Sequence, residues 1–222
     1  MMRTVIFDMD GVIVDTEPVH RYAYYRHFEE LGIQVPDEQY AEFMGRSTRN
    51  VYQQLKDQHG LPQPVEDLMR MKREFFNRAF DEKPDLDLLD GVRRLIEDLH
   101  QHDIQLILAS SASHGTIDRV MRRFAIGPYF SHLVSGEDFP KSKPDPAIFE
   151  HAASLSKAPK QQCVVIEDST NGVTAAKAAG LYCIGYNSEH SPLQDLSHAD
   201  LVVGHFDELT AERIAALPLS AP

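Results

Sequence analysis

Six short apolar runs constrain the fold of this 222-residue chain more than any other feature of its sequence. Most of them are apolar at every position rather than at alternate positions, which is typical of strands buried on both faces. The runs span residues 4–10, 105–111, 132–136, 163–168, 182–186 and 200–204. Strands of this kind belong to parallel sheets that are covered by helices on both sides.

Amphipathic helical patterns lie between the later runs. In one of them, Val92, Leu95, Ile96 and Leu99 fall on a single helical face. Residues 113–124 and 171–180 also predict helices, and a glycine suited to capping ends the second. Strand alternating with helix predicts an α/β fold with a doubly wound, Rossmann-like parallel sheet.

Residues 17–84 interrupt this alternation. They contain no convincing strand pattern and at least three helical patterns, which end at Gly32, Gly45 and Gly60, before a fourth that runs to about residue 80. A block of this length cannot be a single crossover helix. We therefore expect an all-α subdomain at 17–84, inserted into a catalytic core made of residues 1–16 and 85–222.

The charge and the apolar pattern restrict the possible partners and location. The formal net charge is −12, from 34 acidic and 22 basic residues, so nucleic acid and anionic membranes are not expected partners. No apolar run approaches the roughly 20 residues of a membrane span, and the first ten residues do not resemble a signal peptide. Cys163 and Cys183 lie inside apolar runs and read as buried free thiols. A soluble, cytoplasmic protein is expected, and, since no heptad pattern is present, a monomer.

Polar side chains gather where the predicted strands end. Ligands of open parallel sheets bind at the carboxyl ends of the strands. The polar residues there are Asp8, Asp10, Ser110, Ser111, Glu167 and Asp168, with Lys143 in the loop after the run at 132–136. Several carboxylates in one crevice need a cation, and Mg²⁺ prefers carboxylate oxygens together with substrate phosphate. Hydroxyl groups and a lysine are donors of the kind that hold a phosphoryl group.

Four motifs in this order resemble those of the haloacid dehalogenase superfamily. "FDMDGVIVDT" at 7–16 resembles its nucleophile motif, and "ILASS" at 107–111 resembles its second motif. "KPDP" at 143–146 is similar to the third, and "VIEDSTNGVTAAKAAG" at 165–180 is similar to the fourth. The helical insertion after the first motif resembles the cap of the subfamily that includes β-phosphoglucomutase and small-molecule phosphatases.

The resemblance implies a role for each of these residues. Asp8 would attack phosphorus and form an aspartyl-phosphate, while Asp10 would protonate the leaving alcohol and then act as a base. Mg²⁺ would be bound by Asp8, the backbone carbonyl of Asp10 and Asp168, with Glu167 close by. Ser110, Ser111 and Lys143 would hold the phosphoryl group. An acid at position 10 favours phosphate ester chemistry over cleavage of C–Cl or C–P bonds.

The resemblance also extends into the inserted block. Thr16 and His20 match a hinge segment that helps to couple cap closure to Asp10. Gly45 begins a segment similar to the specificity loop, and Arg46, Arg49 and Lys72 are candidate substrate contacts. The chain departs from the mutase pattern here, because Thr48 and Ser113 stand where the mutase has an arginine and a lysine.

These features favour one function and leave two alternatives. The favoured function is a Mg²⁺-dependent phosphatase for a small phosphorylated metabolite, a sugar phosphate. The first alternative is a β-phosphoglucomutase-like isomerase that interconverts sugar 1- and 6-phosphates. The second is a phospho-receiver signalling domain, which is disfavoured because receivers are about half this length and carry their aspartate on an internal strand.

Overall fold

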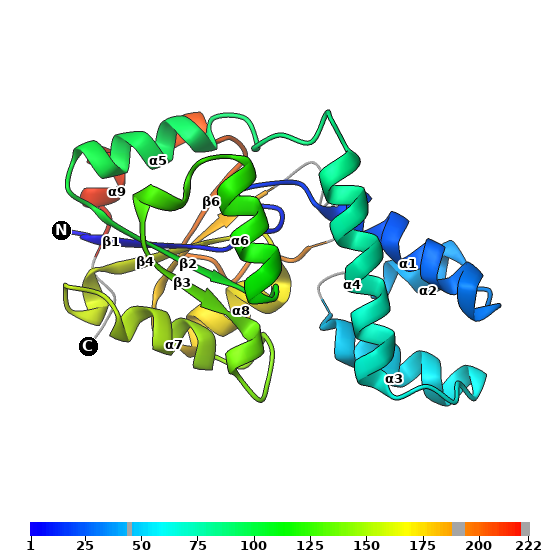
Figure 1. Ribbon diagram of the computed structural model, residues 1–222. Coiled ribbons are helices and arrows are strands. Elements are labelled where there is room, and N and C mark those ends of the chain that lie inside the picture. The colour runs from blue at the N-terminus through cyan, green and yellow to red at the C-terminus, as the bar shows by residue number, and fades with distance from the viewer. Residues whose placement is uncertain (44–45, 188–193, 219–222) are drawn as a thin grey trace. The chain divides into compact units, whose positions relative to one another are not determined.

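The chain folds into two compact units. The computed structural model describes residues 1–43, 46–187 and 194–218 (Figure 1). One unit is Met1–Asp15 with Asp87–Pro222, and the other is Thr16–Leu86. The division expected from the sequence lay at residues 16/17 and 84/85.

The larger unit is built on a six-stranded sheet in which every neighbouring pair of strands is parallel. The strand order is β3-β2-β1-β4-β5-β6. The strands are β1 (Thr4–Phe7), β2 (Gln105–Ser110), β3 (Phe130–Ser135), β4 (Cys163–Glu167), β5 (Tyr182–Tyr186) and β6 (Leu201–Val203). The predicted α/β class and parallel sheet are confirmed.

The order of the strands indicates where this sheet could bind a ligand. The last residue of β1, Phe7, is in register with Leu108 of β2 on one side and with Ile166 of β4 on the other. The chain proceeds from β1 to β2 and β3 in one direction and to β4, β5 and β6 in the other. The carboxyl end of β1 is therefore the switch point at which open α/β sheets bind their ligands.

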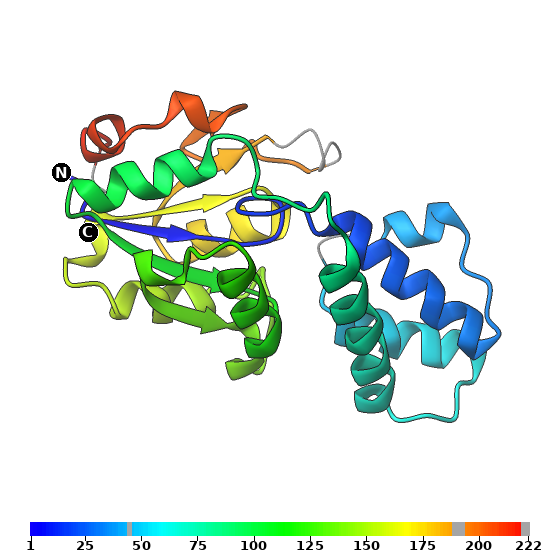
Figure 2. The ribbon, with the colours of Figure 1, turned by 45° about the horizontal axis from the view of Figure 1, so that its top comes forward.

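Helices cover both faces of this sheet. Figure 2 shows α5 and α9 on one face and α7 and α8 on the other. The helices are α5 (Val92–Gln101), α6 (His114–Arg123), α7 (Ala147–Ser154), α8 (Thr170–Ala178) and α9 (Ala211–Ala215), with 3₁₀ turns η1 (Gly127–Tyr129), η2 (Gly136–Asp138), η3 (Lys160–Gln162) and η4 (Phe206–Glu208). The sequence did not predict α7 and α9, since both are too short to show a helical period.

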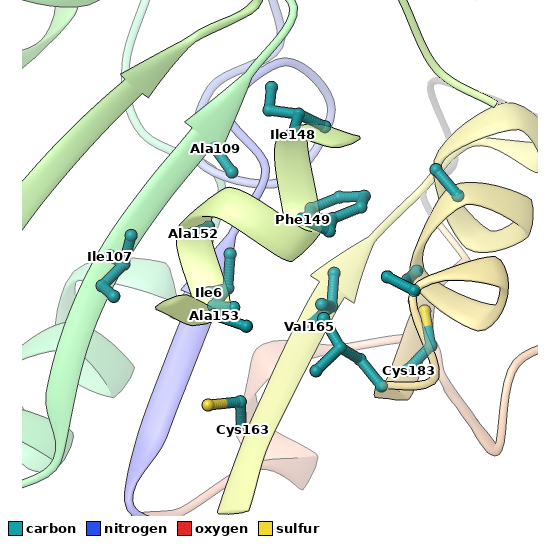
Figure 3. Close-up of a cluster of buried hydrophobic side chains, with 14 of the residues drawn as sticks. Ile6, Ile107, Ala109, Ile148, Phe149, Ala152, Ala153, Cys163, Val165 and Cys183 are labelled. Carbon is teal, nitrogen blue, oxygen red and sulfur yellow. The ribbon is translucent and has the colours of Figure 1, made fainter. Parts of the chain in front are cut away.

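A cluster of buried apolar side chains lies beneath α7 and α8. Ile6, Ile107 and Val165, from three adjacent strands, contribute to one buried cluster with Phe149 and Ala152 of α7 (Figure 3). All of β1 and β4 is buried, as their continuous apolar sequences require. The rigid central strands consequently hold the residues that follow them in fixed positions.

The smaller unit, in its described residues, is all helical. It contains α1 (Glu17–Leu31), α2 (Asp37–Ala41), α3 (Thr48–His59) and α4 (Val65–Glu82). Gly32 and Gly60 end α1 and α3 in the left-handed conformation, with φ of 66° and 64°, as predicted. Gly45, expected to end another helix, lies outside the described residues. No helix in the part of the chain that the structure describes has the length and apolarity to span a membrane.

Candidate active site

The turn after β1 positions the first candidate residues. The Met9 carbonyl accepts hydrogen bonds from the backbone N–H groups of Val12, Ile13 and Val14, at 3.3, 2.8 and 3.2 Å. Gly11 has a φ of 79°, which favours glycine. The chain thus turns back immediately after Asp8, whose side chain is 9% exposed at the edge of the sheet.

Asp168 lies against the same turn. It follows β4 and is 6% exposed. A Cβ atom added to Gly11 would stand 2.0 Å from Oδ2 of Asp168, so only a glycine lets this carboxylate approach the turn so closely. Gly11 and Asp168, 157 positions apart in the sequence, are brought together because β1 and β4 are neighbours in the sheet.

Lys143 joins the ends of three strands. Its Nζ donates to Oδ1 of Asp8, to Oε1 of Glu167 at 2.8 Å and to the carbonyl of Ala109 at 3.2 Å. It also lies 4.6 Å from the centre of the Phe149 ring, and its side chain is 6% exposed. By contrast, Lys141 is 77% exposed, and its nitrogen lies 3.7 Å from a carboxylate oxygen of the half-buried Asp145. Of the two nearby lysines, the one chosen from the sequence is thus the buried one.

Burial and neighbouring charges both change the pKa values of Asp8 and Lys143. Burial raises the pKa of Asp8 to about 7, the negative charges of Glu167 and Asp10 add to the increase, and Lys143 opposes it. Burial alone would lower the pKa of Lys143, but Asp8 and Glu167 together hold it above its ordinary value. Lys143 is therefore a permanent cation, and further positive charge at this edge would favour ionised Asp8.

Both oxygens of Glu167 are engaged in hydrogen bonds. Oε1 accepts from Lys143, and Oε2 accepts from the backbone N–H and the hydroxyl of Ser169, at 2.8 and 2.9 Å. A Cβ atom added to Gly172 would lie 1.7 Å from Oε1, so α8 approaches Glu167 at a position without a side chain. The sequence analysis did not single out Ser169 or Gly172. A serine directly before a helical pattern is an N-cap signal that would have indicated Ser169, whereas no local signal indicates Gly172.

The loop after β2 supplies hydroxyl and backbone donors. Ser110, the last residue of β2, is fully buried, and its Oγ accepts a hydrogen bond from the backbone N–H of Ala112 at 3.0 Å. Ser111 is exposed at the start of the loop. Since β2 is adjacent to β1, this loop begins at the same edge of the sheet as Asp8.

The donor set at this edge fits Mg²⁺. Asp8 and Asp168 offer carboxylate oxygens, and the backbone carbonyl of Asp10 offers a third hard oxygen. In residues 1–43, 46–187 and 194–218, no three acids, histidines or cysteines group closely enough to hold a metal by themselves. Mg²⁺ usually takes only one or two protein carboxylates and completes its shell with water and substrate phosphate.

Two candidate residues of the helical unit meet inside it. Nζ of Lys72 lies 2.6 Å from Nδ1 of His20 and 4.5 Å from the centre of the Tyr24 ring. Burial and then the nearby Lys72 lower the pKa of His20 well below its ordinary value. Neutral His20 therefore accepts a hydrogen bond from Nζ of Lys72, a residue that is only 4% exposed.

Thr16, Arg46 and Arg49 are the other candidate residues of the helical unit that the structure describes. Thr16 is buried, and its carbonyl accepts the backbone N–H of His20 at 2.8 Å. The other two bases are on the surface: Arg46 donates to Gln54 at 2.7 Å, and Arg49 pairs with Glu66 at 2.7 Å.

The chain resembles several known proteins. The model of the haloacid dehalogenase-like hydrolase family matches residues 5–186. The chain is 31% identical over 216 residues to β-phosphoglucomutase of Bacillus subtilis, covering 95% of this chain and 93% of that protein. It is 34% identical over 190 residues to a phosphorylated carbohydrates phosphatase of Thermotoga maritima, covering 86% and 87%.

Solved structures agree with these matches. The crystal structure of CbbY from Rhodobacter sphaeroides in complex with xylulose-(1,5)bisphosphate has a TM-score of 0.88 and 27% identity, covering 98% of this chain and 100% of that one. The fold, the family model and two relatives above 30% identity all indicate the same family. The chain belongs to the family of haloacid dehalogenase-like hydrolases.

Proposed function

We propose that this protein is a Mg²⁺-dependent phosphatase that hydrolyses a small sugar phosphate through an aspartyl-phosphate. The observation that carries the proposal is the buried Lys143, which pairs with Asp8 and Glu167 at the switch point of the sheet. A permanent cation that touches a candidate nucleophile suits a reaction whose substrate brings its own negative charge.

In the proposed reaction, a carboxylate oxygen of Asp8 forms a bond to phosphorus while the bond from phosphorus to the leaving oxygen breaks. Asp10 gives its proton to that oxygen, so the alcohol leaves neutral. Asp10 then takes a proton from water, whose oxygen attacks phosphorus, releases inorganic phosphate and restores Asp8. Mg²⁺, when bound by Asp8, Asp168 and the Asp10 carbonyl, supplies positive charge that offsets the charge of the phosphoryl oxygens.

The other residues of the site orient the phosphoryl group. Lys143 and the donors of Ser110 and Ser111 bind its oxygens in this proposal. Glu167 fixes Lys143 by accepting its hydrogen bond, and it lies beside the metal ligands. In this proposal, Arg46, Arg49 and Lys72 of the helical unit remain the candidate contacts for the remainder of the substrate.

Sugar phosphates are the substrate class best supported by the relatives. One is named as a phosphatase of phosphorylated carbohydrates, and another was solved with a sugar bisphosphate. The second candidate function, a β-phosphoglucomutase-like isomerase, is supported by the match to β-phosphoglucomutase over nearly the whole chain. The two functions differ only in whether water or a sugar hydroxyl receives the phosphoryl group. Family membership leaves the receiver alternative without support.

The expectations of a monomer and of a cytoplasmic location also remain proposals. The second is supported by Cys163 and Cys183, which are buried and form no disulfide.

A metabolite screen tests the proposed function. The purified protein is incubated with phosphorylated sugars and other phosphate esters, with Mg²⁺ or with a chelator, and free phosphate is measured. We expect release from at least one sugar phosphate, its loss on chelation, and no turnover by Asp8→Asn. Asp103→Asn is the matched control, because Asp103 lies in an αL turn that asparagine also favours. Equal turnover by wild type and Asp8→Asn would contradict the mechanism.

A further inference from the structure

The loop after β2 is attached to the end of β3 by contacts that the reaction scheme does not use. Ser110 and Ser135, the last residues of the two strands, are in register. Beyond them, residues 135–138 contact residues 111–114 through backbone, hydroxyl and carboxylate groups. We call residues 135–138 the β3 clamp.

The closest of these contacts is between backbones. A Cβ atom added to Gly136 would lie 2.9 Å from Cα of Ser111 and 3.1 Å from its carbonyl oxygen. Gly136 does not have a positive φ, so a glycine is needed there only for this close approach. Any side chain at position 136 would push the backbone of Ser111 away.

Three hydrogen bonds hold the next residues of the loop. Oγ of Ser135, a fully buried residue, donates to the carbonyl of Ala112 at 2.7 Å and accepts the backbone N–H of Glu137 at 3.2 Å. The Glu137 carboxylate in turn accepts the backbone N–H of His114 at 3.1 Å. Nε2 of His114 also lies 2.9 Å from Oδ1 of Asp138.

We infer that the β3 clamp positions the backbone of Ser111 and Ala112 for binding the phosphoryl group, with Ser135, Gly136 and Glu137 as positioning residues. The inference rests on the proposed function, in which this loop binds the transferred group. Small displacements of a binding loop are costly because hydrogen bonds to phosphate depend steeply on distance and angle. The clamp restrains the loop from the side away from β1, since β2 lies between β1 and β3.

Gly136→Ala is the direct test. We expect its affinity for inorganic phosphate, measured by calorimetry with Mg²⁺, and its kcat/KM for p-nitrophenyl phosphate to fall together by about 10- to 100-fold. Gly115→Ala is the matched control: the same substitution lies near the loop, in α6, but its Cβ would meet nothing within 4 Å. The control is expected to keep wild-type affinity and activity, and the Tm values of the two variants should agree within a few degrees.

A second pair of variants keeps the test decisive if Gly136→Ala does not fold. Glu137→Ala removes the acceptor of the His114 N–H, whereas Glu137→Gln keeps an acceptor oxygen at the same place. We expect the alanine variant to bind phosphate several-fold more weakly and the glutamine variant to bind it as wild type does. Ser135→Ala should behave as Glu137→Ala does.

The outcomes separate the inference from the proposed function. Unchanged phosphate affinity and kcat/KM in Gly136→Ala would overturn the inference, and so would losses that follow Tm alone in every variant. A wild-type protein that binds phosphate but hydrolyses no ester would overturn the proposed function. In that case the phosphate affinities of the variants still decide whether the clamp positions the loop.

Discussion

Lys143 holds its charge between two buried carboxylates, and this makes it the most sensitive residue of the site. We predict that Lys143→Met lowers kcat/KM by at least about 10²-fold, since it removes a donor to the phosphoryl group. The substitution also leaves Asp8 and Glu167 buried without their cation, so the free energy of unfolding should fall by about 3–5 kcal/mol. Kinetics and chemical denaturation measure the two effects.

Lys141→Met, two residues away from Lys143, is the control for this prediction. Lys141 is exposed and pairs with Asp145 rather than with a site carboxylate, so Lys141→Met should change both quantities very little. Similar losses in the two variants would mean that positive charge in the loop, rather than the buried contacts of Lys143, is what matters.

Asp10 can be tested through the leaving group. In the proposed reaction it protonates an alcohol, which an alkyl phosphate needs and p-nitrophenyl phosphate does not. We predict that Asp10→Asn slows hydrolysis of an alkyl sugar phosphate by about 10²–10⁴-fold and that of p-nitrophenyl phosphate far less. Equal losses on both substrates, measured as kcat/KM, would show that Asp10 has only a structural role.

The packing of helix α8 against Glu167 requires a glycine at position 172. Alanine is ordinarily better than glycine inside a helix by about 1 kcal/mol. At Gly172, however, a Cβ would lie within 2.3 Å of three atoms of the buried Glu167 carboxyl group. We predict that Gly172→Ala displaces Glu167 from Lys143 and lowers kcat/KM at least about tenfold, although helix propensity alone predicts a more stable protein.

Gly115→Ala in α6 is again the control variant. Alanine raises the helix propensity at this position, and its Cβ would meet no atom within 4 Å. It should raise Tm slightly and leave kcat/KM unchanged. If Gly172→Ala were as stable and as active as Gly115→Ala, the packing of α8 on Glu167 would be irrelevant to the site.

The helical unit contains a buried histidine–tyrosine pair from which a pH-dependent stability is expected. Nδ1 of His27 lies 2.6 Å from the hydroxyl of Tyr52, and both residues are buried. Burial lowers the pKa of His27 below its ordinary 6.5. The unfolded chain therefore binds a proton more readily, so the stability from neutral His27 is complete above pH 6.5 and decreases as the pH falls below it.

We predict that the difference in unfolding free energy between wild type and His27→Leu shrinks as the pH is lowered from 7.5 to 5.5. Groups that titrate in both proteins cancel in this difference. Denaturant titrations at several pH values give the two curves. Parallel curves over the whole range would contradict the prediction.

The elements differ in how far the sequence predicts them. Most of the strands follow from continuous apolar runs. This is clearest for β1 and β4, in which every residue is buried, whereas β3 carries exposed Ser131 and His132. The C-termini of α1 and α3 follow from Gly32 and Gly60, which take the left-handed conformation. In contrast, α7 contains only eight residues and is stabilised by packing on the sheet, so its sequence carries no clear helical period.

For the whole molecule, the sequence predicts which residues end the strands but not which atoms pair. Asp8, Lys143 and Glu167 were expected at one edge of the sheet because parallel strands share that edge. The engagement of both Glu167 oxygens and the close approach of Gly136 to Ser111 depend on the packing of elements distant in sequence. Such contacts leave no local pattern, and only the three-dimensional structure reveals them.

A phosphatase and a mutase differ in how they treat a sugar bisphosphate. A mutase must retain a sugar bisphosphate, which needs fixed cations for the phosphate that is not being transferred. Thr48 stands where the mutase has an arginine, and its hydroxyl carries no positive charge. Arg49 is paired with Glu66, which leaves Lys72 as the buried cation of the described helical unit. Each missing charged hydrogen bond weakens retention by about 1.5–3 kcal/mol, or roughly 10- to 100-fold.

We therefore predict that β-glucose 1-phosphate, if it is accepted, gives mainly glucose and free phosphate, and that added glucose 1,6-bisphosphate does not produce an efficient isomerase. A coupled glucose 6-phosphate dehydrogenase assay, run beside a phosphate assay, measures the two products. Thr48→Arg restores a cation at the position of the mutase arginine, so it should raise the ratio of glucose 6-phosphate to phosphate. Wild-type protein that forms glucose 6-phosphate much faster than phosphate would instead establish the mutase, because water would then be the slower acceptor.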